Sequence, residues 1–510
     1  MKNIFTKSLA VIAMAVMGTA CDLNLYPEGS IVMVDGEPLF QKSSDVESFG
    51  VGVYTYFRAC NGSGSCVPEE LMFGGFNAVS DYGNNYGPIH RLDKTFTSGD
   101  DDVEGYWGNN YISINNYNIV IDEADKVAGT ELEAAARKIQ GDAYFARAFS
   151  YLQLARHFGP AYDAAKASTD LCVPLVLHYD QHGKPARATV KAVYDQIKAD
   201  LDSAMVRLTA AGKTGNTASQ EFTTDAVTAL YARYYLDVAD YAKAVEAAAG
   251  LINNSAYALS ESQDALDSMW RADNTKEAIL QMYASQAEAP SSITAFTGYG
   301  TDTRSTTGYA YKPLFIPSKA LLALYKATDY RYKVWFSSTS TDPIIVNASS
   351  FKNIMIFSKY LGNVEYNSSG IPSGQVAAKP LKIGEMYLIA AEASYMDGDD
   401  TAAKNYLNQL QSKRSGTISK TATIEAIRDE WTRETVCEGL TLANYKRWGI
   451  GFTTREAQDA AVNNSVIMTG ADYDGKSLND GDYHLTWPIP AYERKINKNL
   501  VQNKGYEELN

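Results

Sequence analysis

Residues 131–158 read ELEAAARKIQGDAYFARAFSYLQLARHF, and this stretch decides the fold class. Alanines and large apolar residues recur along it at helical spacing, and Gly159-Pro160 ends the pattern with a strong helix breaker. Small residues such as Ala143 and Ala146 allow another helix to approach closely. The stretch therefore predicts one member of a packed helical hairpin.

The same pattern recurs on both sides of this stretch. We expect three helix pairs: 111–127 with 131–158, 190–208 with 224–253, and 382–395 with 401–414. A turn at 240–244 divides the last segment of the middle pair. Helical hairpins of this texture, similar to tetratricopeptide repeats, bury a core by stacking on one another. Their spacing is irregular, so we predict a helical scaffold with long insertions and no continuous solenoid.

The insertions have a different composition. Residues 61–105, 284–374 and 451–482 are rich in Gly, Ser, Thr, Asn and Tyr and have little helical period. Loops of this length are usually functional. Binding a sugar without catalysis requires flat apolar faces for the C–H groups and nearby amides or carboxylates for the hydroxyls, and aromatic rings supply such faces.

Two stretches of the insertions supply these groups. Residues 77–90 (NAVSDYGNNYGPIH) and 296–311 (FTGYGTDTRSTTGYAY) place tyrosines beside amides and charges, among glycines that let a loop present them outward. The alternative is that the tyrosines fold back onto the core. The candidate ligand-binding residues are Tyr82, Asn84, Asn85, Tyr86, Tyr299, Asp302, Arg304, Tyr309 and Tyr311.

The N-terminus has the layout of a bacterial secretory signal. Lys2 and Lys7 precede the apolar run LAVIAMAVM at 9–17, and the small residues 18–20 lead into Cys21. The run is too short to span a membrane. We predict a signal peptide over 1–20 and a lipid-modified Cys21, whose acyl chains would hold the protein on a membrane. The alternative is an ordinary secreted protein with a cysteine near its cleavage site.

The net charge excludes some classes of binding partner, and the spacing of the cysteines indicates their chemical state. A net charge of −14 argues against nucleic acid and against electrostatic docking to anionic lipid. Cys60 and Cys66 bracket the flexible segment NGSGS, which predicts a local disulfide in an exported protein. Cys172 and Cys437 are expected to be buried thiols, and the spacing of the cysteines matches no zinc pattern.

Nothing in the chain indicates catalysis or a cofactor. The five histidines show no metal spacing, and GxSxG and HExxH are absent from the sequence. With 60 acidic residues, chance carboxylate pairs have no diagnostic value for glycoside hydrolysis. The acidic runs at 100–104 and 397–400 are interpreted as turns flanking helices. We therefore predict no catalytic residues, no metal and no cofactor.

Seven motifs, in order, carry a resemblance to one family. They are 139–159 (IQGDAYFARAFSYLQLARHFG) with 173–176 (VPLV), 187–208 (RATVKAVYDQIKADLDSAMVRL), 222–244, 382–414, Glu438-Gly439, 446–449 (KRWG), and 487–490 (WPIP) with Gln502-Asn503 and Gly505-Tyr506. Together they resemble the RagB/SusD family of Bacteroidetes outer-membrane lipoproteins. Lys382 and Gln411 stand where the family usually has arginine, Thr441 where arginine is common, and Lys504 where it has proline.

The resemblance implies a mainly α fold with a tetratricopeptide-like scaffold and a large irregular ligand-binding subdomain of loops and short strands. The scaffold is expected over 106–260, 375–450 and 484–510, and the irregular subdomain over 61–105, 261–374 and 451–483. Residues 21–60 would form the lipid-anchored segment and the first helix.

The resemblance also implies a function without catalysis. The protein would sit on the cell surface, capture oligosaccharide and deliver it to a SusC-like TonB-dependent β-barrel transporter in the outer membrane. Three alternatives remain open: a mainly structural lid of the transporter, a peptide-binding member of the family, and a surface glycoside hydrolase.

Overall fold

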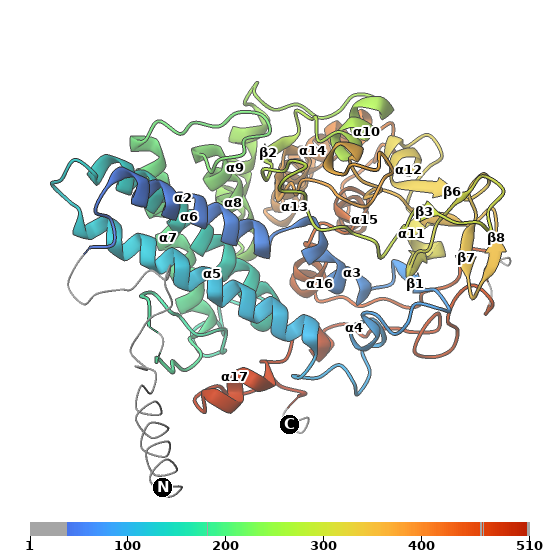
Figure 1. Cartoon of the computed structure of the whole chain (residues 1–510), viewed down its shortest axis with the longest axis horizontal. Coiled ribbons are helices and arrows are strands. Elements are labelled where there is room, and N and C mark those ends of the chain that lie inside the picture. The colour runs from blue at the N-terminus through green and yellow to red at the C-terminus, as the bar shows by residue number, and fades with distance from the viewer. Residues whose placement is uncertain (1–37, 181, 460–461, 463, 507–510) are drawn as a thin grey trace, which may run out of the picture.

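A computed structural model describes residues 38–506 apart from 181, 460–461 and 463. The predicted signal peptide and Cys21 lie outside these residues. The described chain is mainly helical, as predicted (Figure 1). None of the helices in the described part is both long and apolar enough to cross a membrane.

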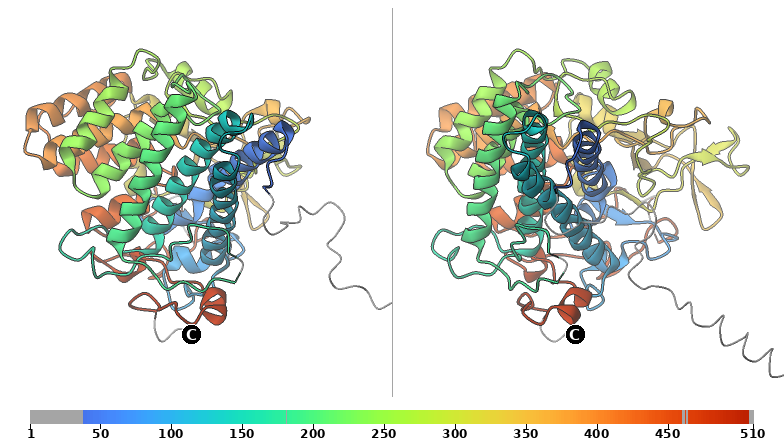
Figure 2. Two further views of the ribbon diagram at one scale, coloured as in Figure 1. Left: turned by 90° about the vertical axis from the view of Figure 1, so that its left-hand side faces the viewer. Right: turned by 60° about the vertical axis from the view of Figure 1, so that its left-hand side comes forward.

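Long helices pack side by side in one half of the molecule (Figures 1 and 2). In chain order, each of α5 to α9 packs on the next, α9 packs on α13, α13 packs on α14 and α15, and α2 covers α5 and α6. The helices of this half are α2 (Ser43–Cys60), α5 (Asp101–Lys126), α6 (Glu133–Phe158), α7 (Val190–Ala210), α8 (Thr224–Asp237), α9 (Tyr241–Ile252), α13 (Ile383–Met396), α14 (Asp400–Lys413), α15 (Ile424–Thr435) and α16 (Thr441–Trp448).

Helix α5 starts earlier than the sequence pattern indicates. The pattern predicts a start at residue 111, and the helix begins at Asp101. The side chain of Asp100 accepts hydrogen bonds from the backbone N–H groups of Asp102 and Val103, at 3.0 and 3.4 Å. This cap satisfies donors that a helix start otherwise leaves unpaired, and it offsets the poor helix propensity of the Gly- and Asn-rich turns that follow.

Short strands gather at the opposite end of the molecule from α7, except for β2 (Ala278–Leu280) and β10 (Leu381–Lys382), which pack against α8 and α13 (Figure 1). They form five antiparallel pairs: β1 (Phe76–Ala78) with β5 (Phe315–Pro317), β2 (Ala278–Leu280) with β10 (Leu381–Lys382), β3 (Gly300–Thr301) with β4 (Tyr309–Ala310), β6 (Phe336–Ser338) with β9 (Met355–Phe357), and β7 (Ile344–Val346) with β8 (Ser349–Phe351).

Short helices connect the strands and close the chain. They are η1 (Ser63–Cys66), α3 (Val67–Leu71), α4 (Gly87–Arg91), α10 (Gln263–Arg271), α11 (Lys319–Ala323), α12 (Tyr330–Trp335), η2 (Val364–Tyr366), η3 (Tyr483–Leu485) and α17 (Ala491–Ile496). The strand-rich half has a core of its own, in which Phe76, Phe296 and Phe357 meet ring to ring. The surface loops of this half are therefore supported by a hydrophobic core.

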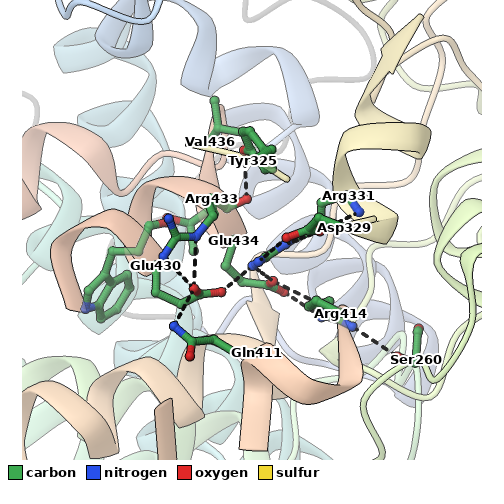
Figure 3. Close-up of polar contacts among 12 residues, drawn as sticks. Ser260, Tyr325, Asp329, Arg331, Gln411, Arg414, Glu430, Arg433, Glu434 and Val436 are labelled. Atoms are coloured by element: carbon green, nitrogen blue, oxygen red, sulfur yellow. Dashed lines mark hydrogen bonds and ion pairs between the residues drawn. The ribbon is translucent and has the colours of Figure 1, made fainter. Parts of the chain in front are cut away.

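A buried ion-pair network joins the two halves (Figure 3). Arg331 on α12 bonds Glu430 and Glu434 on α15, at 2.6 and 2.9 Å. Arg414 bonds the same Glu434 at 2.6 Å and Glu277 at 2.7 Å. Asp329, the N-cap residue of α12, pairs with Arg331 at 2.8 Å. Because these charges are shielded from water, the network fixes α12 firmly against α15.

The predicted bridge between Cys60 and Cys66 is wrong, because all four cysteines of the described chain lack disulfide bonds. Cys60 ends α2 and its sulfur lies 3.1 Å from the Ser113 hydroxyl on α5. The Cys66 thiol instead donates to the Cys437 carbonyl oxygen at 2.8 Å. The intervening residues form a helical turn that directs the two thiols toward different neighbours. Cys172 and Cys437 are buried thiols, as expected.

Candidate functional site

The second tyrosine stretch forms a hairpin that carries an aromatic stack. Strands β3 and β4 pair Thr301 with Tyr309. The rings of Tyr299 and Tyr309 are nearly parallel, with centroids 5.8 Å apart and an interplanar angle of 15°. Tyr311 packs on Tyr299 at 4.6 Å. Tyr309 is 36% exposed, so the stack offers an aromatic face to solvent.

Polar groups surround this stack. The carboxylate of Asp302 accepts hydrogen bonds from the backbone and guanidinium of Arg304, at 2.9 and 2.6 Å, and pairs with Lys312 at 2.9 Å. These hydrogen bonds, the one from the Arg304 side chain above all, hold the pKa of Asp302 well below its usual range. The hydroxyl of Tyr299 donates to Asp342 at 2.9 Å. The hairpin is thus held in one shape while Arg304 stays exposed.

The first tyrosine stretch behaves differently. Tyr82 is only 5% exposed, and its ring packs on Phe315 in the core of the strand-rich half. Its hydroxyl accepts from Arg91 at 2.8 Å and lies 3.2 Å from the Tyr473 hydroxyl. Burial, reinforced by the contact with Tyr473, raises the pKa of Tyr82 to about 12. Tyr86 also lies against this core, half-buried. The two rings have folded back, so neither presents an open stacking face.

The amides of that stretch remain at the surface. Asn84 and Asn85 are exposed, and Asn84 adopts a left-handed conformation with φ of 60°. The side-chain oxygen of Asn84 accepts from Arg91 at 2.7 Å, and the side-chain amide of Asn85 donates to the backbone carbonyl oxygen of Tyr82 at 2.6 Å. These contacts hold the loop and leave its amides beside solvent.

The β7–β8 hairpin lies between the two stretches. The backbone N–H of Asn347 donates to the Asp81 carboxylate at 2.8 Å. On the other side, Tyr311 donates its N–H to the Pro343 carbonyl oxygen at 2.9 Å. Asp302 raises the pKa of Arg304, and Asp81 raises it further. Charged groups of the two stretches therefore interact electrostatically. The structure therefore assembles both stretches around one hairpin.

Two residues of this surface, Asn347 and Asp342, are absent from the sequence-predicted set. Both flank strand β7 in the stretch DPIIVNASSF. Asn347 follows the β-branched run 344–346 and adopts a positive φ of 46°, and an Asn at the end of such a run is a recognisable turn signal. The contact of this hairpin with residues 80–81 joins positions far apart in the chain, which no local pattern encodes.

A cavity of about 620 Å³ lies elsewhere, between α2, α5 and the segment 282–291. Its lining includes Arg58, Asp102, Asn110 and Tyr283. Sequence reasoning missed it because its lining comes from segments that are far apart in the chain, near residues 55–68, 101–110, 282–291 and 376–378. No cluster of three His, Cys, Asp or Glu residues suited to a metal ion occurs in the described part of the chain. The acidic runs have structural roles instead, since Asp100 caps α5 and Asp399 caps α14.

Comparison with known proteins shows matches to two related family models and to two relatives. Residues 70–236 match a family model described as starch-binding, associating with outer membrane, and residues 325–506 match the model of the SusD family. The SusD-like protein P2 of Formosa agariphila is 25% identical over 94% of this chain and 96% of its own length. The starch-binding protein SusD of Bacteroides thetaiotaomicron is 30% identical over 25% of this chain and 21% of its own.

Solved structures agree on the fold. A crystal structure of a SusD superfamily protein from Bacteroides thetaiotaomicron superposes with a TM-score of 0.72 at 22% identity, over 90% of this chain and 99% of that one. The fold of nearly the whole chain is thus similar to that of a SusD superfamily protein.

Proposed function

The chain belongs to the RagB/SusD family, and from that premise we propose that it is a surface lipoprotein that binds oligosaccharides and delivers them to a SusC-like outer-membrane transporter. The observation that carries the binding role is the near-parallel stack of Tyr299 and Tyr309. It supplies the flat apolar face that a pyranose ring requires, and the exposed guanidinium of Arg304, held by the buried Asp302, lies on the same hairpin.

Several further features support a carbohydrate ligand. The surface combines aromatic faces with amides and hydroxyls from two loop stretches, which suits a ligand rich in both C–H groups and hydroxyls. One relative bears the name starch-binding protein, and one matching family model is described as starch-binding. With a net charge of −14, a neutral glycan is favoured over a polyanionic one.

The location and the partner are part of the same proposal. The family model over residues 70–236 is described as associating with outer membrane. A lipid on Cys21 would tether the protein there, and the two halves would hold ligand above the barrel. A binding protein so placed needs no catalytic residues of its own, and the enzyme alternative has no motif in its favour.

Alanine substitution at Tyr309 tests the binding role. We expect Tyr309→Ala to weaken binding of the responding oligosaccharide about tenfold, or ~1.4 kcal/mol, because the outer ring of the stack is lost. Isothermal titration calorimetry against a panel of hexasaccharides measures this. Tyr492→Ala removes another exposed tyrosine, on α17, and is the matched control.

The outcome also separates binding from a purely structural lid. Weakened binding with unchanged co-purification of the transporter supports capture by this chain. Equal affinity for Tyr309→Ala, Tyr492→Ala and the wild type would contradict the assignment of the tyrosine surface.

A further inference from the structure

The cavity between α2 and α5 is built from segments that are distant in the chain. One wall is the last turns of α2 and the residues that follow it, and the other is the first turns of α5. The segments 282–291 and 376–378 complete the lining. At about 620 Å³, it falls in the size range of small-molecule sites.

The lining segment 282–291 carries an exposed ring. Arg58 on α2 donates to the Tyr283 carbonyl oxygen at 3.2 Å and pairs with Glu288 at 2.6 Å. These contacts hold 283–288 against α2 and leave Tyr283 44% exposed. Tyr106, Met282 and Val376 add apolar surface to the lining. The cavity therefore has an aromatic ring in its lining together with apolar walls.

One buried polar atom in the lining lacks a partner. Asn110 is 3% exposed, and its amide nitrogen donates to the Tyr106 carbonyl oxygen at 2.8 Å. Its carbonyl oxygen is buried and has no hydrogen-bond donor among the described residues. A buried acceptor left unpaired costs free energy, and a ligand hydroxyl would remove that cost.

The same face of α5 leaves space. Gly105 and Asn109 also line the cavity. A Cβ atom at Gly105 would meet no atom within 4 Å, so the glycine opens room there. A glycine within a helix costs stability relative to other residues, and this one is not required by close packing.

The charge of the lining limits what can enter. The lining contains three carboxylates, those of Asp101, Asp102 and Glu288, and one guanidinium, that of Arg58. Arg58 is already paired with Glu288. The lining is therefore net negative, which opposes uronic or sulfated sugars. Carboxylate and amide oxygens accept hydrogen bonds from hydroxyl groups.

We propose that this cavity is a second ligand site, separate from the tyrosine surface, that takes a neutral oligosaccharide. Tyr106 and Tyr283 contact the sugar C–H faces, and Asn110 and Asp101 accept from its hydroxyls. The inference rests on the proposed role in glycan capture and extends it from one site to two.

Two variants test it without weakening the fold. Gly105→Leu fills the open space and raises helix propensity, and Asn110→Leu removes the unpaired acceptor at nearly constant volume. Gly108→Leu is the control, because a Cβ atom there also meets nothing within 4 Å and Gly108 lines a different pocket, beside Trp107 and Tyr111. Tyr309→Ala serves as the background in which the other surface is weakened.

The probes are maltohexaose, cellohexaose, laminarihexaose and mannohexaose, with hexagalacturonate as the anionic comparison. We expect residual saturable binding of a neutral hexasaccharide in the Tyr309→Ala background. Gly105→Leu and Asn110→Leu should each weaken it at least about tenfold, Gly108→Leu should not, and all three should unfold no earlier than the background.

Each other outcome has a definite meaning. If Gly105→Leu and Gly108→Leu bind alike while Tyr309→Ala abolishes binding, the second site is refuted and glycan capture stands. If hexagalacturonate alone binds, the result supports glycan capture and refutes a second site for neutral oligosaccharides. If no hexasaccharide binds the wild type, both proposals fail.

Discussion

Glu70, on α3, is a carboxyl group enclosed by the protein at the junction of the two halves. It accepts hydrogen bonds from the Cys437 backbone N–H at 3.0 Å and the Thr441 hydroxyl at 2.7 Å. Burial outweighs these contacts and raises the pKa of Glu70 to about 7. The folded protein therefore holds this proton more tightly than the unfolded chain does.

The Glu70 proton gives a prediction about pH. Because its pKa is raised on folding, the contribution of Glu70 to stability is present at low pH and is lost as pH rises from about 4.5 through 7. Glu70→Gln removes the titration and keeps an acceptor. The unfolding free energy of the variant relative to wild type should thus rise between pH 4.5 and 8, by a few kcal/mol (~1.4 per unit of pKa shift). Urea denaturation at both pH values measures it, and a pH-independent difference would refute the assignment.

Residue-scale prediction from sequence succeeded unevenly. Tyr82 and Tyr309 both stand near glycines in Tyr-rich loops, yet one ring is buried and the other exposed. The difference arises because Phe315, far along the chain, packs on Tyr82. Local composition finds loops that contain suitable groups, but only the tertiary contacts decide which rings face solvent.

At the scale of elements, α5 links the scaffold to the cavity. Its N-terminal turns line the cavity, and its cap at Asp100 fixes where those turns begin. The alanine-rich periodicity of α6 predicted that helix closely, because its pattern is local. The first turns of α5 were assigned to a loop, since Gly and Asn are poor helix formers and the cap signal stood ahead of them.

The cap has a measurable contribution. Asp100→Ala should lower the unfolding free energy by about 1 kcal/mol, since two backbone N–H groups lose their acceptor. Asp101→Ala, one residue on and exposed, is the control and should change it by less. Chemical denaturation of the two variants compares them. Equal losses would mean that the cap does not set the start of α5.

At the scale of the whole molecule, buried charges join the scaffold to the strand-rich half. Arg331, Arg414 and Glu434 are fully buried, and each contacts two oppositely charged groups or more. The sequence shows these residues, but it cannot show that α12 and α15 bring them together. The helical texture and the ordered motifs nevertheless predicted the fold class, because both are spread along the chain.

Breaking this network should be costly. Glu434→Gln leaves two buried guanidinium groups short of a carboxylate, so we expect a loss of about 3–5 kcal/mol in unfolding free energy. Lys413→Met breaks an exposed pair with Glu261 and should cost under about 1 kcal/mol. Thermal and urea unfolding distinguish the two. A loss for Glu434→Gln no larger than that for Lys413→Met would contradict the role given to the network.

Membrane attachment is a separate prediction at this scale. Cys21→Ser should release the protein from membranes when the transporter gene is deleted, because no acyl chain would remain. Fractionation followed by immunoblotting measures the distribution. Continued membrane partitioning of Cys21→Ser in that strain would contradict lipid anchoring.

Calorimetric titration would show whether this protein captures a glycan. Residues 22–510 would be titrated with a panel of polysaccharides, neutral and acidic oligosaccharides, and peptide mixtures. We predict saturable binding of a neutral oligosaccharide class that weakens about tenfold in Tyr309→Ala. Saturable binding of peptides alone, or the absence of binding to every ligand of the panel, would contradict glycan capture.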